Sequence, residues 1–142
     1  MKLRHYGSKT CDLRKFKAIK NGYWVKPSKG GLWTSPVDSE WGWKDWNDSE
    51  EFVVCDDQNS FIVYLKEDAK ILTIDSHEDL LNAPLTDMLR LDFEHIAETY
   101  DAIWLTIKGQ RDTRFSYPVT LYGWDCETVL ILNKKCIIKA TQ

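Results

Sequence analysis

The chain has 142 residues, 43% of them hydrophobic and 29% charged, and its formal net charge is −3. These values are typical of one globular domain that buries a core, and no internal repeat or low-complexity tract suggests a second domain. No apolar run approaches the roughly 18 residues that cross a bilayer, and the first residues lack a signal-peptide stretch. We therefore expect a single cytoplasmic domain over residues 1–142.

Strands are predicted where β-branched and aromatic residues run together and polar residues close the run. In chain order these segments are residues 61–65 (FIVYL), 70–74 (KILTI), 102–107 (AIWLTI) and 128–132 (TVLIL), with weaker candidates at 3–6 and 117–122. Residues 26–36 are predicted to be a loop, because the PSKGG run combines a proline with glycines that permit unusual dihedral angles.

Helices are predicted in the middle of the chain. Ser76 is a typical N-cap followed by acidic residues, and its helix should end before Pro84. Apolar residues at helical spacing over 86–100 predict one helix or two short ones. This order of elements favours an α+β fold over a regular βαβ alternation.

Charge is distributed unevenly along the chain. Before Gly30, Asp12 is the only acid against nine cations: Lys2, Arg4, Lys9, Arg14, Lys15, Lys17, Lys20, Lys26 and Lys29. Residues 38–57 have the opposite sign, with Lys44 as their only cation. Two solvated faces that serve solubility are one interpretation, and a basic edge beside an acidic edge on one surface is the other.

The four cysteines do not predict a metal site or a disulfide framework. Cys11, Cys55, Cys126 and Cys136 are widely spaced, form no Cys-x-x-Cys pair and have no neighbouring histidine to complete a zinc site. We expect reduced thiols and no bound metal.

Two clusters of residues are candidates for a site. Five of the seven tryptophans lie between Trp24 and Trp46, where they either pack on the core or line a site for a flat ring. Asp125 and Glu127 precede the most apolar predicted strand and, two apart in an extended segment, should point to the same side. An ordinary polar strand cap is the alternative for these carboxylates.

Three segments, in chain order, resemble the motif regions of the ADP-ribosyltransferase superfamily. They are LRHYGS (Leu3–Ser8), GLWTSPVDSEWGWKDW (Gly31–Trp46) and DCETVLILN (Asp125–Asn133). They are most similar to the branch of diphtheria toxin and the poly(ADP-ribose) polymerases, which has a histidine, then an aromatic with a following polar and aromatic segment, then a glutamate. The matching residues are His5, then Trp33 with Ser35, Ser39 and Trp41, then Glu127.

The resemblance implies an ADP-ribosyltransferase-like split β-sandwich of two small antiparallel or mixed sheets with a few short helices. It implies that NAD is the co-substrate, that Glu127 stabilises the reacting ribose and that Asp125 orients or deprotonates the acceptor. His5 would bind the adenosine side of NAD, Tyr6 or Gly7 backbone groups would bind the carboxamide, and Trp33 and Trp41 would enclose the nicotinamide. The acceptor would be a protein or nucleic acid, as for an effector, toxin or defence protein.

The sequence is also compatible with other functions. A second branch of the superfamily uses an arginine, a serine and an acidic residue two before the glutamate, which Arg4, Ser35 and Asp125 fit. An RNA 2′-phosphotransferase also uses NAD, and needs a cationic cleft for the RNA phosphate. A non-catalytic module that binds a peptide, base or protein through the tryptophan-rich segment is the alternative outside enzymes.

Overall fold

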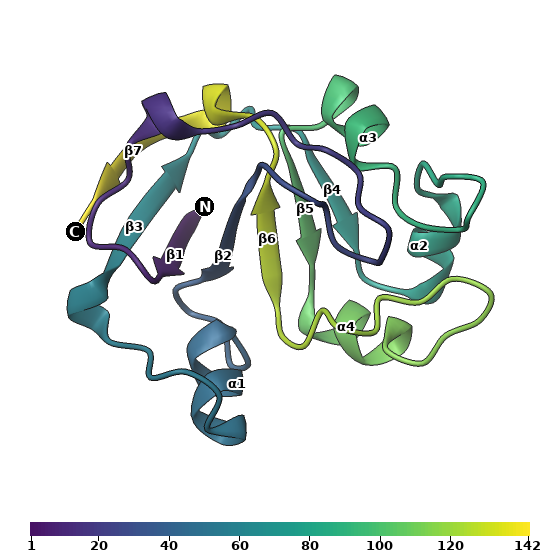
Figure 1. Cartoon of the computed structure of the whole chain (residues 1–142), viewed down its shortest axis with the longest axis horizontal. Helices are drawn as coiled ribbons and strands as arrows, with labels where there is room; N and C mark the ends of the chain where they lie inside the picture. Colours follow the sequence, from purple (N-terminus) through teal and green to yellow (C-terminus); the bar gives the residue numbers. More distant parts are fainter.

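The computed structural model describes residues 1–142 and contains one mixed sheet of seven strands in the order β4-β5-β6-β2-β1-β3-β7 (Figure 1). The strands are β1 (Lys2–Tyr6), β2 (Leu32–Pro36), β3 (Ser60–Leu65), β4 (Ile71–Ile74), β5 (Ala102–Leu105), β6 (Thr128–Ile131) and β7 (Ile137–Thr141). Only β4 and β5 run parallel, and all other neighbours are antiparallel. The α+β prediction is confirmed, but two separate sheets do not form, because β2 pairs with β1 along one edge and β6 along the other.

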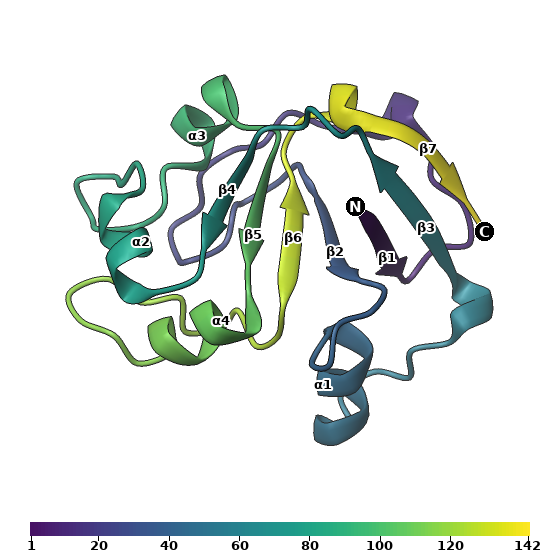
Figure 2. The same cartoon turned by 180° about the vertical axis from the view of Figure 1, so that it is seen from behind.

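Four short helices accompany the sheet. They are α1 (Trp43–Glu50), α2 (His77–Asn82), α3 (Phe93–Thr99) and α4 (Ile107–Thr113), and single 3₁₀ turns lie at η1 (Leu13–Lys15), η2 (Asp57–Asn59) and η3 (Lys134–Cys136). Figures 1 and 2 show α2, α3 and α4 beside the β4-β5-β6 half, while α1 lies at the end of β2. The helices of this chain are all too short and too polar to cross a membrane.

The central strands are buried on both faces of the sheet. Ile103 and Leu130 belong to a core that includes the apolar side chains of α2 and α3. Val129 and Ile131, one position away on β6, belong to a second core with Leu3. Because side chains alternate along a strand, β6 needs an unbroken apolar run, as the sequence has at 128–132.

Most apolar strand predictions are confirmed, as is the helix after Ser76, whose hydroxyl accepts a hydrogen bond from the Asp79 N–H at 3.1 Å. The predicted strand 102–107 ends at Leu105, because Thr106 caps α4 through a 3.0 Å hydrogen bond from the Gly109 N–H. The predicted strand 117–122 is wrong, since that segment is a loop.

Other elements were missed by sequence reasoning. The predicted loop 26–36 ends in β2, and residues 137–141 (IIKAT), for which no strand is predicted, form β7. The helical pattern over 86–100 produces only α3, because an isolated bridge between Leu85 and Leu91 closes a turn and Asp92 then caps the helix.

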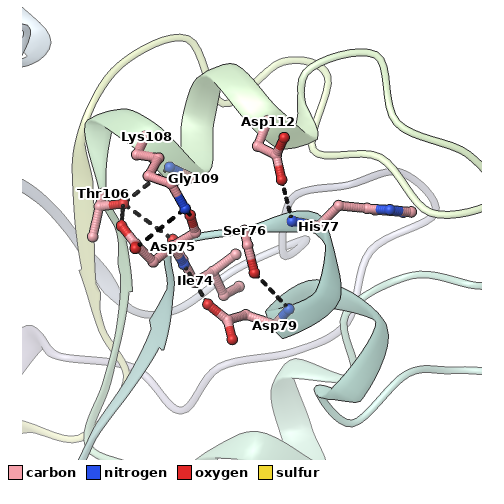
Figure 3. A network of polar contacts seen from close by, with 9 residues as sticks. All are labelled: Ile74, Asp75, Ser76, His77, Asp79, Thr106, Lys108, Gly109 and Asp112. Carbon is pink, nitrogen blue, oxygen red and sulfur yellow. Dashed lines mark hydrogen bonds and ion pairs between the residues drawn. The ribbon is translucent and has the colours of Figure 1, made fainter.

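Polar side chains fasten α2 and α4 to the end of β4 and the residues after it (Figure 3). Thr106 donates its hydroxyl to Asp75 Oδ1 at 2.6 Å, and the His77 N–H donates to Asp112 Oδ2 at 2.6 Å. Gly109 lies directly against the carbonyl of Ile74, so a Cβ at this position would collide with the backbone. Close backbone contact at Gly109 therefore sets the distance between α4 and β4.

We predict that Gly109→Ala lowers the free energy of unfolding by roughly 1–3 kcal/mol, because the new methyl group overpacks a backbone contact. In an unobstructed helix the same substitution would stabilise by about 1 kcal/mol. Urea denaturation measures the difference, with the exposed Arg111→Ala in the same helix as control. Unchanged or increased stability of Gly109→Ala would contradict the packing described.

Candidate functional site

The three segments singled out in the sequence meet on neighbouring strands. β6, β2 and β1 are adjacent in the sheet, although β6 lies near the far end of the chain from β1. Arg4 is paired with Ser35 across β1 and β2, and Trp33 is paired with Leu130 across β2 and β6. Backbone hydrogen bonding thus brings residues from three distant segments within side-chain reach of one another.

A cavity of about 300 Å³ lies where these strands meet. Six of the predicted site residues line it: Arg4, His5, Tyr6, Trp33, Ser35 and Asp125. The other lining residues are Lys26, Thr34, Trp43, Gly123, Trp124, Cys126 and Thr128. Four predicted residues lie outside the lining, namely Gly7, Ser39, Trp41 and Glu127.

Glu127 is buried. Its carboxylate contacts β5, a strand that contributes no residue to the cavity lining. Its Oε2 accepts a hydrogen bond from the Trp104 indole N–H at 2.8 Å. Asp125 lines the cavity and Glu127 does not, although the two are expected to point to the same side; the chain bends at Cys126, and the strand begins only at Thr128. Oε1 of Glu127 has no hydrogen bond within the chain and keeps some solvent contact.

Trp41 holds the segment that carries both carboxylates. Its indole N–H donates to the Asp125 carbonyl at 3.0 Å, and its own carbonyl accepts from the Glu127 N–H at 2.8 Å. Trp41 therefore positions the backbone on either side of Cys126, while the Asp125 side chain lines the cavity.

Ser35 connects three elements through one buried hydroxyl. Its Oγ donates to the Glu127 carbonyl at 2.8 Å and accepts from the Trp43 N–H at 2.9 Å. Trp43 is the first residue of α1, so the hydroxyl joins β2, the start of α1 and the segment before β6. This contact fixes the cavity wall that Trp43 forms.

Three indoles line the cavity, from Trp33, Trp43 and Trp124. Trp124 is buried, its N–H donates to the Val25 carbonyl at 2.9 Å, and its ring meets Trp33 edge-on at a centroid distance of 5.0 Å. The resemblance implies Trp41 as the partner of Trp33, whereas in the structure Trp43 and Trp124 line the cavity with Trp33. The position of Trp124 beside Asp125 was the available signal for it.

His5 has a defined tautomer. Its Nδ1 lies 2.8 Å from the Trp33 carbonyl oxygen, and because a carbonyl only accepts, Nδ1 must carry the hydrogen. The ring also packs on Phe61 at a centroid distance of 4.9 Å. Nε2 thus remains as a hydrogen-bond acceptor.

Two cations border the cavity. Arg4 forms an ion pair with Asp57 at 3.0 Å, and Lys26 Nζ lies 5.9 Å from the centre of the Trp33 ring. The Tyr6 hydroxyl donates to the same Asp57 carboxylate at 2.9 Å. Burial raises the pKa of the Tyr6 phenol, and its hydrogen bond to Asp57 raises it further, so Tyr6 is a neutral donor at physiological pH.

Gly7 and Ser39 have structural contacts. The Gly7 N–H donates to the Asn59 carbonyl at 2.9 Å, so this amide is already paired. The Ser39 hydroxyl accepts from the Trp41 N–H at 3.2 Å and thereby shapes the turn before α1.

Cys126 is the one thiol in the cavity wall. Burial raises its pKa from 9.0 to about 11, so it is protonated at neutral pH and unsuited to act as a nucleophile. Burial also raises the pKa of Cys136 to about 11, and all four cysteines are unpaired.

We predict that Ser35→Ala lowers the free energy of unfolding by about 1–3 kcal/mol, because it leaves two backbone groups without their partner in a buried position. Urea denaturation measures the loss. Ser39→Ala, in the turn after the same strand, is the control and should cost less, because Ser39 is only partly buried and its hydroxyl pairs one backbone group instead of two. Equal effects would show that Ser35 does not have the connecting role described.

We also predict that stability falls as the pH rises from about 9 to 11. Burial raises the pKa of the Cys126 thiol in the folded state, so the thiol loses its proton more readily in the unfolded chain. Its contribution to the free energy of unfolding is therefore complete below the pKa of the unfolded chain and is lost as the pH rises toward the folded pKa. Denaturation at several pH values measures this slope. Cys126→Ala should make the slope shallower, and an unchanged slope would contradict the assignment.

Comparison with known proteins identifies no relative: no protein-family model, curated protein or solved structure matches this chain. Its function is therefore argued from the site.

Proposed function

We propose that this protein transfers ADP-ribose from NAD to a macromolecular acceptor. The observation that carries the proposal is that the segments resembling the three ADP-ribosyltransferase motifs lie on neighbouring strands, β1, β2 and β6, around one cavity. Six of the ten site residues that the resemblance implies line this cavity. The same adjacency supports an ADP-ribosyltransferase-like variant of the fold in which the two halves share β2.

The cavity lining supports NAD as the ligand. The nicotinamide ring of NAD is flat and positively charged, and the faces of indole rings attract such cations. Trp33 and Trp43 are the partly exposed rings of the lining, and the buried Trp124 supports Trp33 from behind. Arg4 and Lys26 are the cations available to the pyrophosphate. His5 is one of the lining residues, but its ring packs on Phe61, so its part in binding would be to hold β2 through the Trp33 carbonyl.

The proposed reaction breaks the bond between nicotinamide and the ribose C1′. Nicotinamide leaves as a neutral molecule with the bonding electrons, the ribose develops oxocarbenium character, and a nucleophile of the acceptor forms the new bond at C1′. Glu127 is the candidate for stabilising the cation, through the unpaired Oε1 that keeps contact with solvent. Asp125, whose side chain lines the cavity, would take the proton that the acceptor loses.

A non-catalytic binding module is the second candidate. The placement of Glu127 against Trp104 rather than in the cavity wall favours it, because a cavity lined by indoles needs no carboxylate to bind a flat ring. On this alternative Trp43→Ala abolishes ligand binding, while Glu127→Gln has no effect on it.

We predict that Glu127→Gln slows nicotinamide release from NAD by about 100-fold or more, the usual effect of removing one preorganised electrostatic contact. Glutamine keeps an oxygen that can accept from the Trp104 indole and removes only the charge. Chromatography of nicotinamide released by the purified protein, with and without cell lysate as acceptor source, measures the reaction.

Two matched variants complete this experiment. Glu40→Gln makes the same charge change at an exposed site and should leave the rate unchanged. Asp125→Asn should retain NAD cleavage by water and lose transfer to the acceptor. Equal rates of nicotinamide release for Glu127→Gln and the unaltered protein would overturn the mechanism. If the protein neither releases nicotinamide nor binds NAD by calorimetry, the transferase function is rejected and the non-catalytic binding module is the function that stands.

A further inference from the structure

One face of the β1-β3-β7 half carries a row of cations around an aromatic ring. Lys2 of β1 is paired with Tyr64 of β3, and Tyr64 is paired with Lys139 of β7. The two ammonium groups lie 5.8 and 4.7 Å from the centre of the Tyr64 ring. Lys2 and Lys139 are exposed and have no acidic partner within 4.0 Å.

The three residues of the row are accessible, since Lys2 and Lys139 are exposed and Tyr64 is partly exposed. Apolar residues of the segment 11–16, namely Cys11, Leu13 and Phe16, pack on the opposite face, against the second core. The four α-helices lie elsewhere in Figures 1 and 2, with α2, α3 and α4 beside the β4-β5-β6 half and α1 at the end of β2. A sheet face with an accessible aromatic ring between exposed cations is the type of surface on which single-stranded nucleic acids bind.

This face leads to the cavity. Arg4 lies two residues after Lys2 on β1, which is roughly 6.6 Å along an extended strand. It is paired with Ile62 of β3. Arg4 also lines the cavity described above. The Lys2–Tyr64–Lys139 row and the cavity are therefore joined by a single intervening cation.

We propose that this face binds single-stranded nucleic acid and presents it to the cavity as the acceptor. Phosphates would lie on Lys2, Lys139 and Arg4, and a base would contact Tyr64. The ring favours a nucleic acid over an acidic peptide, because carboxylates need only the cations. The acceptor role rests on the proposed transferase function, whereas binding to the face does not.

Fluorescence anisotropy with labelled 12-nucleotide oligo(dT) and oligo(U) tests the binding. Three phosphate contacts predict that the logarithm of the association constant falls with the logarithm of salt concentration with a slope of about −2. Lys2→Gln/Lys139→Gln should weaken binding about tenfold at low salt and reduce the slope to about −0.7. Tyr64→Leu should weaken binding without changing the slope.

Two further variants separate local contacts from net charge. Lys108→Gln/Arg111→Gln removes the same charge from α4, on the other half of the fold, and should change affinity less than twofold (Figure 3 shows Lys108). Asp57→Asn should strengthen binding, because it frees Arg4 from its ion pair. The proposal would be overturned if Lys108→Gln/Arg111→Gln weakened oligonucleotide binding as much as Lys2→Gln/Lys139→Gln does. It would also be overturned if the protein bound poly-glutamate tightly and bound neither oligonucleotide.

Transfer is measured separately, with labelled NAD and the same oligonucleotides. Lys2→Gln/Lys139→Gln should lower labelling of the oligonucleotide at least fivefold while hydrolysis of NAD is unchanged, since neither lysine lines the cavity. Oligonucleotide binding without NAD cleavage would reject the transferase function and keep the binding face. NAD cleavage without oligonucleotide binding would reject the face and keep the transferase.

Discussion

The pairing of β2 along both of its edges is the constraint on which the rest of this structure depends. β1 and β6 come from opposite ends of the chain, and they share a site only because β2 lies hydrogen-bonded between them. The chain enters β2 through Gly30 and Gly31, both with positive φ, and a Cβ at Gly30 would collide with the Ala18 backbone. The Ser35 hydroxyl, near the other end of β2, then holds α1 and the segment before β6 in place.

The strand geometry also divides the candidate residues. Successive side chains of β1 point to opposite faces, so the His5 ring packs on Phe61 of the second core while Arg4 and Tyr6 meet Asp57. The bend at Cys126 similarly separates the cavity-lining Asp125 from Glu127. The site therefore has its indoles and cations in one cavity and its most buried carboxylate beside it. Separate substitution of the two carboxylates is the informative experiment for this reason.

Local charge matters more here than the net charge of −3. Salt screens exposed charges beyond about 8–10 Å at physiological ionic strength, so acids on the far half of the fold have little influence on the Lys2–Tyr64–Lys139 row. Asp57 is the acid in direct contact with Arg4 and Tyr6, and Asp45 of α1 lines the same hollow beside them. The basic segment before Gly30 contributes Lys2 and Arg4 to this surface, and Lys139 comes from the last strand.

Local patterns in the sequence determined the central strands and the helix start at Ser76, because apolar runs and caps act over a few residues. They also identified six of the thirteen residues that line the cavity. The pairing of β2 and β7, the use of Trp43 and Trp124 in place of Trp41, and the contact of Glu127 with Trp104 were decided only by the tertiary structure. Each depends on partners that are distant in sequence, and the direction of a side chain is set by the neighbours that satisfy its hydrogen bonds and cover its apolar surface.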